Sequence, residues 1–326
     1  MARLNILVTG VGAIIGYGIV NSLRMSGREL NIVGIDIYAD AVGQHFCDHF
    51  IQAKRADSPD YLDFLLDVIK RHHIDLVFFG TEQELYRVSD ARDILADYLE
   101  HLVLNSKSVV DLSKDKLKTY SFLCENGIKV IPTRVDGSFR SLSEELGLPF
   151  ILKLRHSYAS KGIFQIHDEL NFNYWKEKAA SEFIFQEIVG DDSHEYTAAI
   201  FGLGEKSAQI PFVFRRRLSG EGATAKAVVE HIPELCEAVF QLADLLQPIG
   251  PTNFQFRRHQ DKYLLLEINP RISSSTSIRA AFGYNEPEMC IRYFLENGDL
   301  GLPTLRSGNA IRYISDWISY ENCTNL

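Results

Sequence analysis

Two segments near the C-terminal end read Thr252-Asn-Phe-Gln-Phe-Arg257 and Tyr263-Leu-Leu-Leu-Glu-Ile-Asn-Pro-Arg271. Their alternating character predicts two strands, and the polar residues 260–262 between them predict a short turn. The apolar side chains are expected to share one face of each strand: Phe254 and Phe256 in the first, Leu264, Leu266 and Ile268 in the second. If the hairpin closes at this turn, Gln255 lies near Glu267, two residues from Asn269.

Gln255, Glu267 and Asn269 would then place three side-chain oxygens on one patch, with Arg271 just beyond it. Hard oxygen donors of this kind suit Mg²⁺, which commonly also holds substrate phosphates. The patch therefore indicates nucleotide chemistry. The alternative is that Glu267 is an ordinary strand carboxylate paired with a nearby arginine.

Composition limits the class of protein. A chain of 326 residues with 46% apolar and 24% charged residues is expected to form two or three globular domains. The formal charge of −9 argues against non-specific nucleic-acid binding. Five scattered cysteines (47, 124, 236, 290 and 323) indicate reduced thiols without a zinc site. With no signal-peptide pattern and no apolar run of membrane-spanning length, we expect a cytoplasmic protein without a membrane partner.

The first hundred residues alternate between strand and helix patterns, which predicts a parallel sheet with helices on both faces. We expect strands at 4–9, 31–37, 76–79 and 102–104, and helices ending near Met25 and at 60–71 and 82–98. Gly10, Gly12 and Gly16, with Asp36 at the end of the second strand, approximate a dinucleotide-binding pattern, although the spacing is off by one. The alternative is a tight turn that needs glycine only for its backbone geometry.

The remaining residues have a different pattern, typical of an α+β domain. Ser113 is a candidate N-cap for a helix that ends before Gly127. Further strands are expected at 149–154, 163–167, 183–189, 194–201 and 207–214, and helices at 171–181, 230–246 and 277–296. Pro287 is expected to break the last helix near its middle.

Several cations in this part are candidates for phosphate binding. Lys153 lies inside an apolar strand and precedes the polar loop 156–162, where hydroxyls and backbone amides could close over phosphates. Lys116 is a second candidate, and Arg215–Arg217 precede a loop that contains Gly220 and Gly222. The alternatives are a snorkelling edge lysine for Lys153 and solvated charges for the others.

In their order along the chain, these segments resemble the ATP-grasp superfamily, particularly the branch of the carbamoyl-phosphate synthetase large subunit. The resemblance covers about residues 105–300. It rests on five segments: Ser113-Lys-Asp-Lys116, Pro149-Phe-Ile-Leu-Lys153, Phe183-Ile-Phe-Gln-Glu187 with Glu195, Asn253-Phe-Gln255, and Leu266-Glu-Ile-Asn-Pro-Arg271-Ile-Ser-Ser-Ser275. It implies a Rossmann-like domain over residues 1–108, a small lid subdomain over 109–185, and a C-terminal subdomain with the metal site over 186–326.

The resemblance also implies roles for individual residues. ATP would be held by Lys116, Lys153, Ser157, Ser160, Gly162, Gln186, Glu187, the backbone of Ile188, and Glu195. Mg²⁺, with Mn²⁺ able to replace it, would be bound by Gln255, Glu267 and Asn269. Arg271 and Lys153 would act in catalysis, together with one arginine of 215–217, for which we favour Arg217. The chain departs from the family at its glycine-poor phosphate loop and at the neutral Gln255.

These implications lead to the hypothesis of an ATP-dependent ligase that joins a carboxylate to an amine through an acyl phosphate. Its partners would be small-molecule carboxylate and amine substrates, and a homodimer is expected at the level of the family. Three alternatives stay open: a carbamoyl-phosphate-synthetase-like enzyme acting on bicarbonate or carbamate, an NAD(P)-dependent oxidoreductase, and a nucleotide sensor without catalysis.

Overall fold

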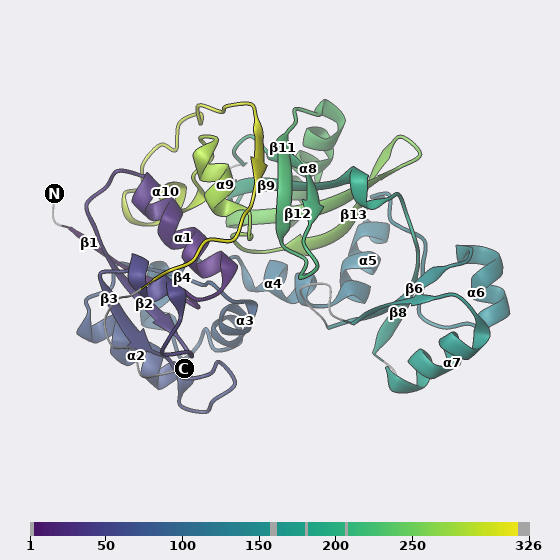
Figure 1. The fold of residues 1–326 in the computed structure, drawn as a ribbon, viewed down its shortest axis with the longest axis horizontal. Coiled ribbons are helices and arrows are strands. Elements are labelled where there is room, and N and C mark those ends of the chain that lie inside the picture. Colours follow the sequence, from purple (N-terminus) through teal and green to yellow (C-terminus); the bar gives the residue numbers. More distant parts are fainter. Residues whose placement is uncertain (1–2, 157–161, 180–181, 206–207, 319–326) are drawn as a thin grey trace.

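The computed structural model describes residues 3–156, 162–179, 182–205 and 208–318, and these residues form three sheets with their helices (Figure 1). A parallel sheet lies at the N-terminal end, a six-stranded sheet occupies the middle, and a small four-stranded sheet projects from the opposite end. Among the described helices, none has both the length and the apolar character needed to cross a membrane.

The N-terminal sheet has the strand order β3-β2-β1-β4, and all of its pairs are parallel. Its elements are β1 (Leu4–Thr9), α1 (Ile14–Met25), β2 (Leu30–Asp36), η1 (Val42–Phe46), β3 (His49–Gln52), α2 (Tyr61–Arg71), β4 (Leu76–Phe78), α3 (Glu82–Asp90) and η2 (Ala96–His101). Ile6 and Val8 of β1 face α1, whereas Leu7 faces α2 and α3. Because alternate residues of β1 are buried on opposite faces, both faces of the sheet are covered, as the sequence predicted.

Two short helices, α4 (Lys107–Lys114) and α5 (Lys116–Glu125), follow this sheet. The prediction of Ser113 as a helix cap is wrong, because Ser113 lies in the last turn of α4 and donates a hydrogen bond to Val109 O. Asp115 caps α5 instead, with its Oδ1 accepting from the backbone of Leu117. Val109 and Leu123 pack on the six-stranded sheet, so both helices belong to its core. The predicted subdomain boundaries at 108 and 185 stay predictions.

The small sheet has the order β5-β8-β6-β7 with antiparallel pairs. It is built from β5 (Thr133–Arg134), α6 (Phe139–Leu146), β6 (Phe150–Leu154), β7 (Ile163–Ile166), α7 (Glu169–Lys178) and β8 (Phe183–Glu187). Its core is separate from the others and rich in aromatic residues, including Phe150, Phe172 and Phe185. A subdomain with its own core can move as a unit.

The six-stranded sheet has the order β13-β12-β9-β10-β11-β14. Its elements are η3 (Asp192–His194), β9 (Glu195–Leu203), β10 (Phe212–Leu218), β11 (Thr224–Val229), α8 (Pro233–Leu246), β12 (Ile249–His259), β13 (Lys262–Asn269) and β14 (Asn309–Ile311). One face packs on α8, α4 and α5. The other face shares a core with α1 and the N-terminal sheet, where Phe212 and Phe214 lie in the same cluster as Ile19. The N-terminal and central sheets are therefore joined by continuous apolar packing.

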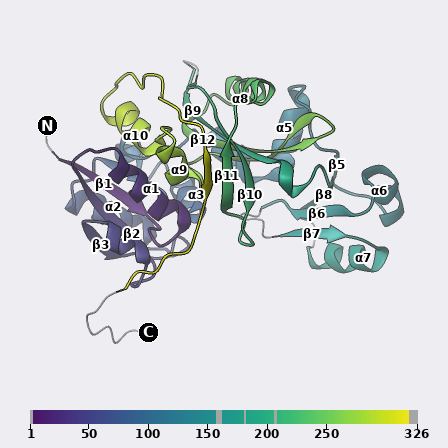
Figure 2. The ribbon, with the colours of Figure 1, turned by 45° about the horizontal axis from the view of Figure 1, so that its top comes forward.

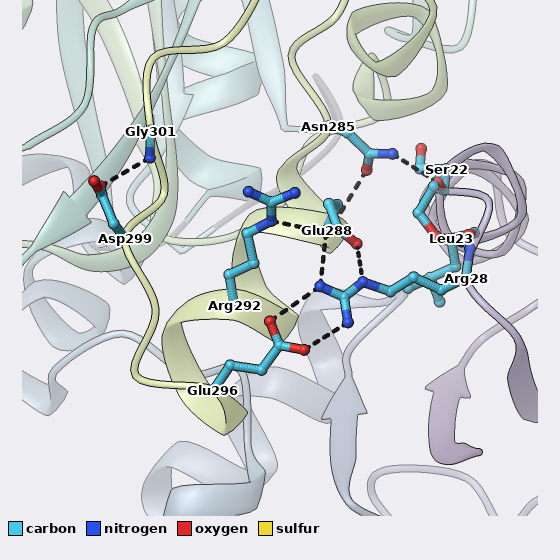
Figure 3. A network of polar contacts seen from close by, with 10 residues as sticks. Ser22, Leu23, Arg28, Asn285, Glu288, Arg292, Glu296, Asp299 and Gly301 are labelled. Atoms are coloured by element: carbon cyan, nitrogen blue, oxygen red, sulfur yellow. Dashed lines mark hydrogen bonds and ion pairs between the residues drawn. The ribbon is translucent and has the colours of Figure 1, made fainter. Parts of the chain in front are cut away.

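The segment after β13 differs from its prediction as one helix over 277–296. It forms α9 (Thr276–Ala281), α10 (Glu286–Cys290) and the π-helical turn η4 (Ile291–Leu295). Pro287 lies in the first turn of α10, where a missing N–H costs nothing, so it begins a helix and does not break one. Arg28, just after α1, binds this segment through Glu288 (Nε–Oε2 2.7 Å) and Glu296 (Nη1–Oε1 2.6 Å), as Figure 3 shows.

The C-terminal segment returns from β14 across the N-terminal sheet (Figure 2). Trp317 stacks on His45 with ring centroids 4.4 Å apart, and Arg312 donates to Thr224 O and Ser274 O. Other local differences from the sequence predictions are small. The helix expected at 82–98 ends at Asp90, the strand expected at 207–214 is β10, and α6 and β11 were not predicted.

Candidate active site

The hairpin of β12 and β13 brings the predicted oxygen donors together. Gln255 lies directly opposite Glu267, and Asn253 lies opposite Asn269. This pairing confirms the expected proximity of Gln255 and Glu267. The hairpin turn brings the two residues close, but the register that the turn sets would place Gln255 opposite Leu266, and a bulge in β13 shifts Glu267 into that position.

The expected common face for Leu264, Leu266 and Ile268 is wrong, because β13 contains a bulge. Phe256 pairs with Leu265, so Leu266 is skipped in the register. An extra residue reverses the alternation of side chains on one side of it. Leu265 and Ile268 consequently pack in the core beneath α8, whereas Leu264 and Leu266 face a different cluster with Ile131 and Val189 at the base of the small sheet.

Two cavities meet at Gln255 and Glu267. The first, which we call the small-sheet cavity, has a volume of about 250 Å³ and also contains Lys116, Lys153 and Glu187. The second, which we call the junction cavity, has a volume of about 240 Å³ and lies between the six-stranded sheet and the starts of α1 and α3. Its polar lining includes Glu82, Arg216, Gln255, Glu267, Asn269 and Arg271. The carboxylate of Glu267 thus faces two different chemical environments.

Glu267 and Gln255 have the properties expected of cation ligands. Among the described residues, none forms a hydrogen bond or an ion pair with either side chain. Burial raises the pKa of Glu267, and the positive charge of Lys116 acts in the opposite direction. Glu267 is half-buried, and a partly desolvated carboxylate without a direct partner is destabilising, a cost that a divalent cation would remove. No described group of three His, Cys, Asp or Glu residues could hold a metal, so a site here would depend on the amide oxygens.

Two lysines lie on the side of the small sheet. Lys153 of β6 is 7% exposed, and its Nζ donates to Gln186 Oε1 at 2.5 Å. Burial, together with the nearby positive charge of Lys116, lowers the pKa of Lys153 to about 8. Burial also lowers the pKa of Lys116, which is the first residue of α5. These two cations are poorly solvated, so an anion such as a phosphate would be strongly attracted to them.

Arg271 is held by Glu82, a residue that the sequence analysis did not single out. Its guanidinium contacts the carboxylate of Glu82 and donates to Asn269 Oδ1 at 2.8 Å. Burial lowers the pKa of Arg271, but the neighbouring carboxylate of Glu82 has the larger effect, so the pKa of Arg271 is raised. Glu82 is the first residue of α3, which follows β4. Residues at the carboxyl ends of parallel strands commonly line ligand-binding sites, and this position could have identified Glu82 from the sequence.

The structure corrects the choice among the three arginines of β10. Arg217 is exposed and is absent from the lining of both cavities, whereas Arg216 is 4% exposed and lines the junction cavity. Successive side chains of a strand point to opposite faces, and Arg216 shares its face with the buried Phe212 and Phe214. Arg216 Nη2 donates to Glu195 Oε1 at 2.9 Å. The arginine available to an anion in the junction cavity is therefore Arg216.

Comparison with known proteins identifies the fold. The family model described as ATP-grasp in the biosynthetic pathway with Ter operon matches residues 192–317. The N5-carboxyaminoimidazole synthetase of Staphylococcus aureus, solved with ADP, is similar over 92% of this chain and 80% of its own, with a TM-score of 0.70 and 19% identity. The chain has an ATP-grasp fold.

Two further solved structures are similar. Biotin carboxylase of Campylobacter jejuni, in a β-γ-ATP complex, has a TM-score of 0.75 at 17% identity, covering 94% of this chain and 74% of its own. The biotin carboxylase domain dimer of the Hydrogenobacter thermophilus 2-oxoglutarate carboxylase was solved with MgADP, ADP and bicarbonate. It has a TM-score of 0.73 at 14% identity, covering 95% and 74% of the two chains. No curated protein matches the sequence.

The other residues implied by the ATP-grasp resemblance lie around the small-sheet cavity. Gln186 and Glu187 end β8 and line it, and Ile188 follows them directly. Glu195 also lines it, but both of its carboxylate oxygens are bound by arginines: Oε1 by Arg216 and Oε2 by Arg257 at 2.8 Å. A ribose hydroxyl would have to share these oxygens. The role of Glu195 in ribose binding stays a prediction.

The loop that precedes β7 is only partly described. Ser157 and Ser160, both predicted to bind ATP, lie outside the described residues. Gly162 has φ of +73°, and a Cβ there would lie 2.8 Å from the side chain of Leu154. The backbone conformation therefore favours glycine at this position, and a larger residue would also have to displace the side chain of Leu154.

The glycine turn of the N-terminal sheet uses Asp36 internally. Asp36 Oδ2 accepts from Gly12 N at 2.8 Å and Oδ1 accepts from Tyr38 N at 3.0 Å. A Cβ at Gly16 would lie 2.0 Å from the carbonyl oxygen of Gly10. The glycines thus serve the close packing of the turn, and the carboxylate expected to bind a dinucleotide ribose already holds two backbone N–H groups.

Proposed function

We propose that the protein is an ATP-dependent ligase that joins a small-molecule carboxylate to an amine. The observation that carries the proposal is the position of Glu267, a half-buried carboxylate without a direct partner among the described residues, at the meeting point of two cavities. One cavity offers Lys116 and Lys153 to the phosphates of ATP. The other offers Arg216 and Arg271 to an anionic substrate.

In this proposal Mg²⁺, or Mn²⁺ in its place, would be held by Gln255, Glu267 and Asn269 and would neutralise the phosphate charge. Lys153 would bind the terminal phosphates and Glu187 with the backbone of Ile188 would bind the adenine. Arg271, fixed by Glu82, and Arg216 would orient the substrate carboxylate. Most of the rate enhancement would come from this alignment and from charge stabilisation.

The chemistry proceeds in two steps. A carboxylate oxygen attacks the γ-phosphorus, the bond from that phosphorus to the bridging oxygen of ADP breaks, and ADP leaves with the electron pair. The nitrogen of the neutral amine then attacks the carbonyl carbon of the acyl phosphate. The C–N bond forms, the C–O bond to phosphate breaks, inorganic phosphate leaves with that electron pair, and the nitrogen releases its proton to solvent. The small sheet would exclude water from the acyl phosphate.

The N-terminal parallel sheet would be the Rossmann-like domain that precedes an ATP-grasp module. A separate observation favours bicarbonate as a second candidate for the carboxylate, because one similar structure was solved with MgADP and bicarbonate. No comparable observation favours the oxidoreductase alternative. The expected homodimer and cytoplasmic location stay predictions.

The test begins with thermal denaturation in the presence of Mg·ATP, ATP with EDTA, or NADPH. A ligand that binds the native state raises the apparent melting temperature, and we expect a rise with Mg·ATP alone. Phosphate release is then screened against pooled carboxylates, including bicarbonate, and pooled amines. Formation of ADP and phosphate that requires a carboxylate supports the ligase, and an ¹⁸O label should pass from that carboxylate into phosphate. Formation of AMP, or stabilisation by NADPH only, would refute it.

A further inference from the structure

A third cavity lies at the carboxyl ends of β1, β2 and β4. We call it the acidic cavity, and its volume of about 600 Å³ exceeds that of either cavity described above. Its wall comes from the glycine turn after β1, from the segments after β2 and β3, and from the first turn of α3. Ligands of open parallel sheets bind at this edge. The roles assigned so far make no use of this space.

The charge of the wall is strongly unbalanced. Its ionisable residues are four acids and one base: Asp36, Asp40, Asp57, Glu84 and Arg55. Arg55 is committed to Asp57 through two hydrogen bonds, Nε–Oδ1 and Nη2–Oδ2, both of 3.0 Å. No cationic side chain in the described part of the chain forms an ion pair with the other three carboxylates. The cavity is therefore a region of negative potential.

Two of these carboxylates are buried and held in position. Asp36 and Glu84 are each 6% exposed. Glu84 accepts hydrogen bonds from three hydroxyl groups, those of Thr9, Tyr61 and Thr81. Burial raises the pKa of Glu84, the hydrogen bonds from the three hydroxyl groups act in the opposite direction, and the charge of Asp36 adds to the rise. These hydrogen bonds fix the oxygens without neutralising them, so a cation entering the cavity would relieve a repulsion that is already present.

The acidic cavity adjoins the junction cavity. Ala13, Thr81 and Gln83 line both of them, so one short border separates the two spaces. Across that border lie Glu267 and Arg271, where the acyl phosphate of the proposed reaction would form. A molecule bound in the acidic cavity could thus present one end to the reacting carbonyl.

We propose that the acidic cavity binds an ammonium group of the amine substrate, while a second, neutral amino group of the same molecule attacks the acyl phosphate, and that the chain therefore selects a cationic amine. This inference rests on the ligase function proposed above. The two cavities beside Glu267 offer lysines and arginines to phosphate and carboxylate, whereas this cavity offers carboxylates to the second substrate. The same charge would repel the pyrophosphate of a dinucleotide, and Asp36 already takes the N–H of Gly12 that could have met an anion.

The test measures binding without ATP, so that it does not depend on turnover. Three probes share a five-carbon chain and differ in charge: 1,5-diaminopentane, 1,5-pentanediol and glutarate. Isothermal titration calorimetry should show that the diamine binds, with little heat from the diol and none from glutarate. Asp40→Asn removes an exposed carboxylate that has no partner in the described structure and should weaken diamine binding roughly two- to fivefold. Asp93→Asn removes an exposed carboxylate outside the cavity and should leave the affinity unchanged.

A second pair of variants tests occupancy of the cavity itself. Val42 lines it and is 39% exposed, so Val42→Lys should fold and place an ammonium group inside, weakening diamine binding on the order of tenfold or more. Val42→Leu is the matched control. Three results would overturn the inference. They are unchanged diamine affinity in Val42→Lys, equal losses of affinity in Asp40→Asn and Asp93→Asn, and preferential binding of glutarate. Mg·ATP binding is measured on the same samples: its absence with diamine binding intact refutes the ligase but leaves the cation site standing.

Discussion

Lys153 gives a prediction about stability whose size follows from its surroundings. In the metal-free and nucleotide-free protein, burial lowers the pKa of Lys153 to about 8 from its ordinary value of 10.5. The unfolded chain therefore holds the proton more tightly than the native protein does. Below pH 8 both states are protonated and the native state bears the whole cost of a buried charge. As the pH rises from 8 to 10.5 the cost disappears, so the free energy of unfolding rises.

The difference of 2.5 pK units corresponds to about 3 kcal/mol at pH 7, and about half of that remains at pH 9.5. Replacing Lys153 with Met removes this cost but leaves Gln186 Oε1 without its donor, which costs about 1–2 kcal/mol. We therefore expect Lys153→Met to be more stable than the wild type at pH 7 by about 1–2 kcal/mol. At pH 9.5 that advantage should be lost, a change of about 2 kcal/mol between the two conditions.

Urea denaturation at pH 7 and pH 9.5 measures both values. Lys118→Met is the matched control, because Lys118 is an exposed lysine of the same helix as Lys116, and its effect should not depend on pH. With Mg·ATP present the order should reverse, since phosphate would stabilise the charged Lys153 and cannot bind a methionine. A Lys153→Met variant that is less stable than the wild type by the same amount at both pH values would refute this account of the site.

Three further predictions concern the junction cavity. Glu267→Gln should lower Mg·ATP-dependent turnover by about 10³-fold or more, with an unchanged circular dichroism spectrum, and substantial turnover would exclude Glu267 as a metal ligand. Arg216→Met should reduce the free energy of unfolding by about 3 kcal/mol and abolish turnover. Arg217→Met should change the free energy of unfolding by no more than about 0.5 kcal/mol and remain active, and equal effects of the two variants would contradict the assigned orientation of β10. Glu82→Gln should cost about 2 kcal/mol by urea denaturation, and a double-mutant cycle with Arg271→Met should show coupling of about 1 kcal/mol, which independent residues would not give.

Part of the candidate site could be predicted from the sequence because it depends on local geometry. The proximity of Gln255 and Glu267 follows from a hairpin that closes between His259 and Lys262, although their direct pairing also depends on the bulge at Leu266. Lys153 was identified because a lysine inside an apolar strand is unusual, and the structure buries it. The bulge at Leu266 could not be predicted, because the alternation that suggested a strand assumes that every residue is paired.

The sequence by itself determined the parallel sheet at the N-terminus, the hairpin, and the proximity of its oxygen donors, since each follows from periodicity and turns over a few residues. Only the tertiary structure decided that Arg216 faces the cavity and that Glu82 holds Arg271 from 189 residues away. It also decided that the largest of the three cavities is acidic, because Asp40, Asp57 and Glu84 meet there from separate segments. Such contacts depend on how α3 packs against the six-stranded sheet. That packing is set by the shapes of side chains from distant segments, which cannot be read from a local sequence pattern.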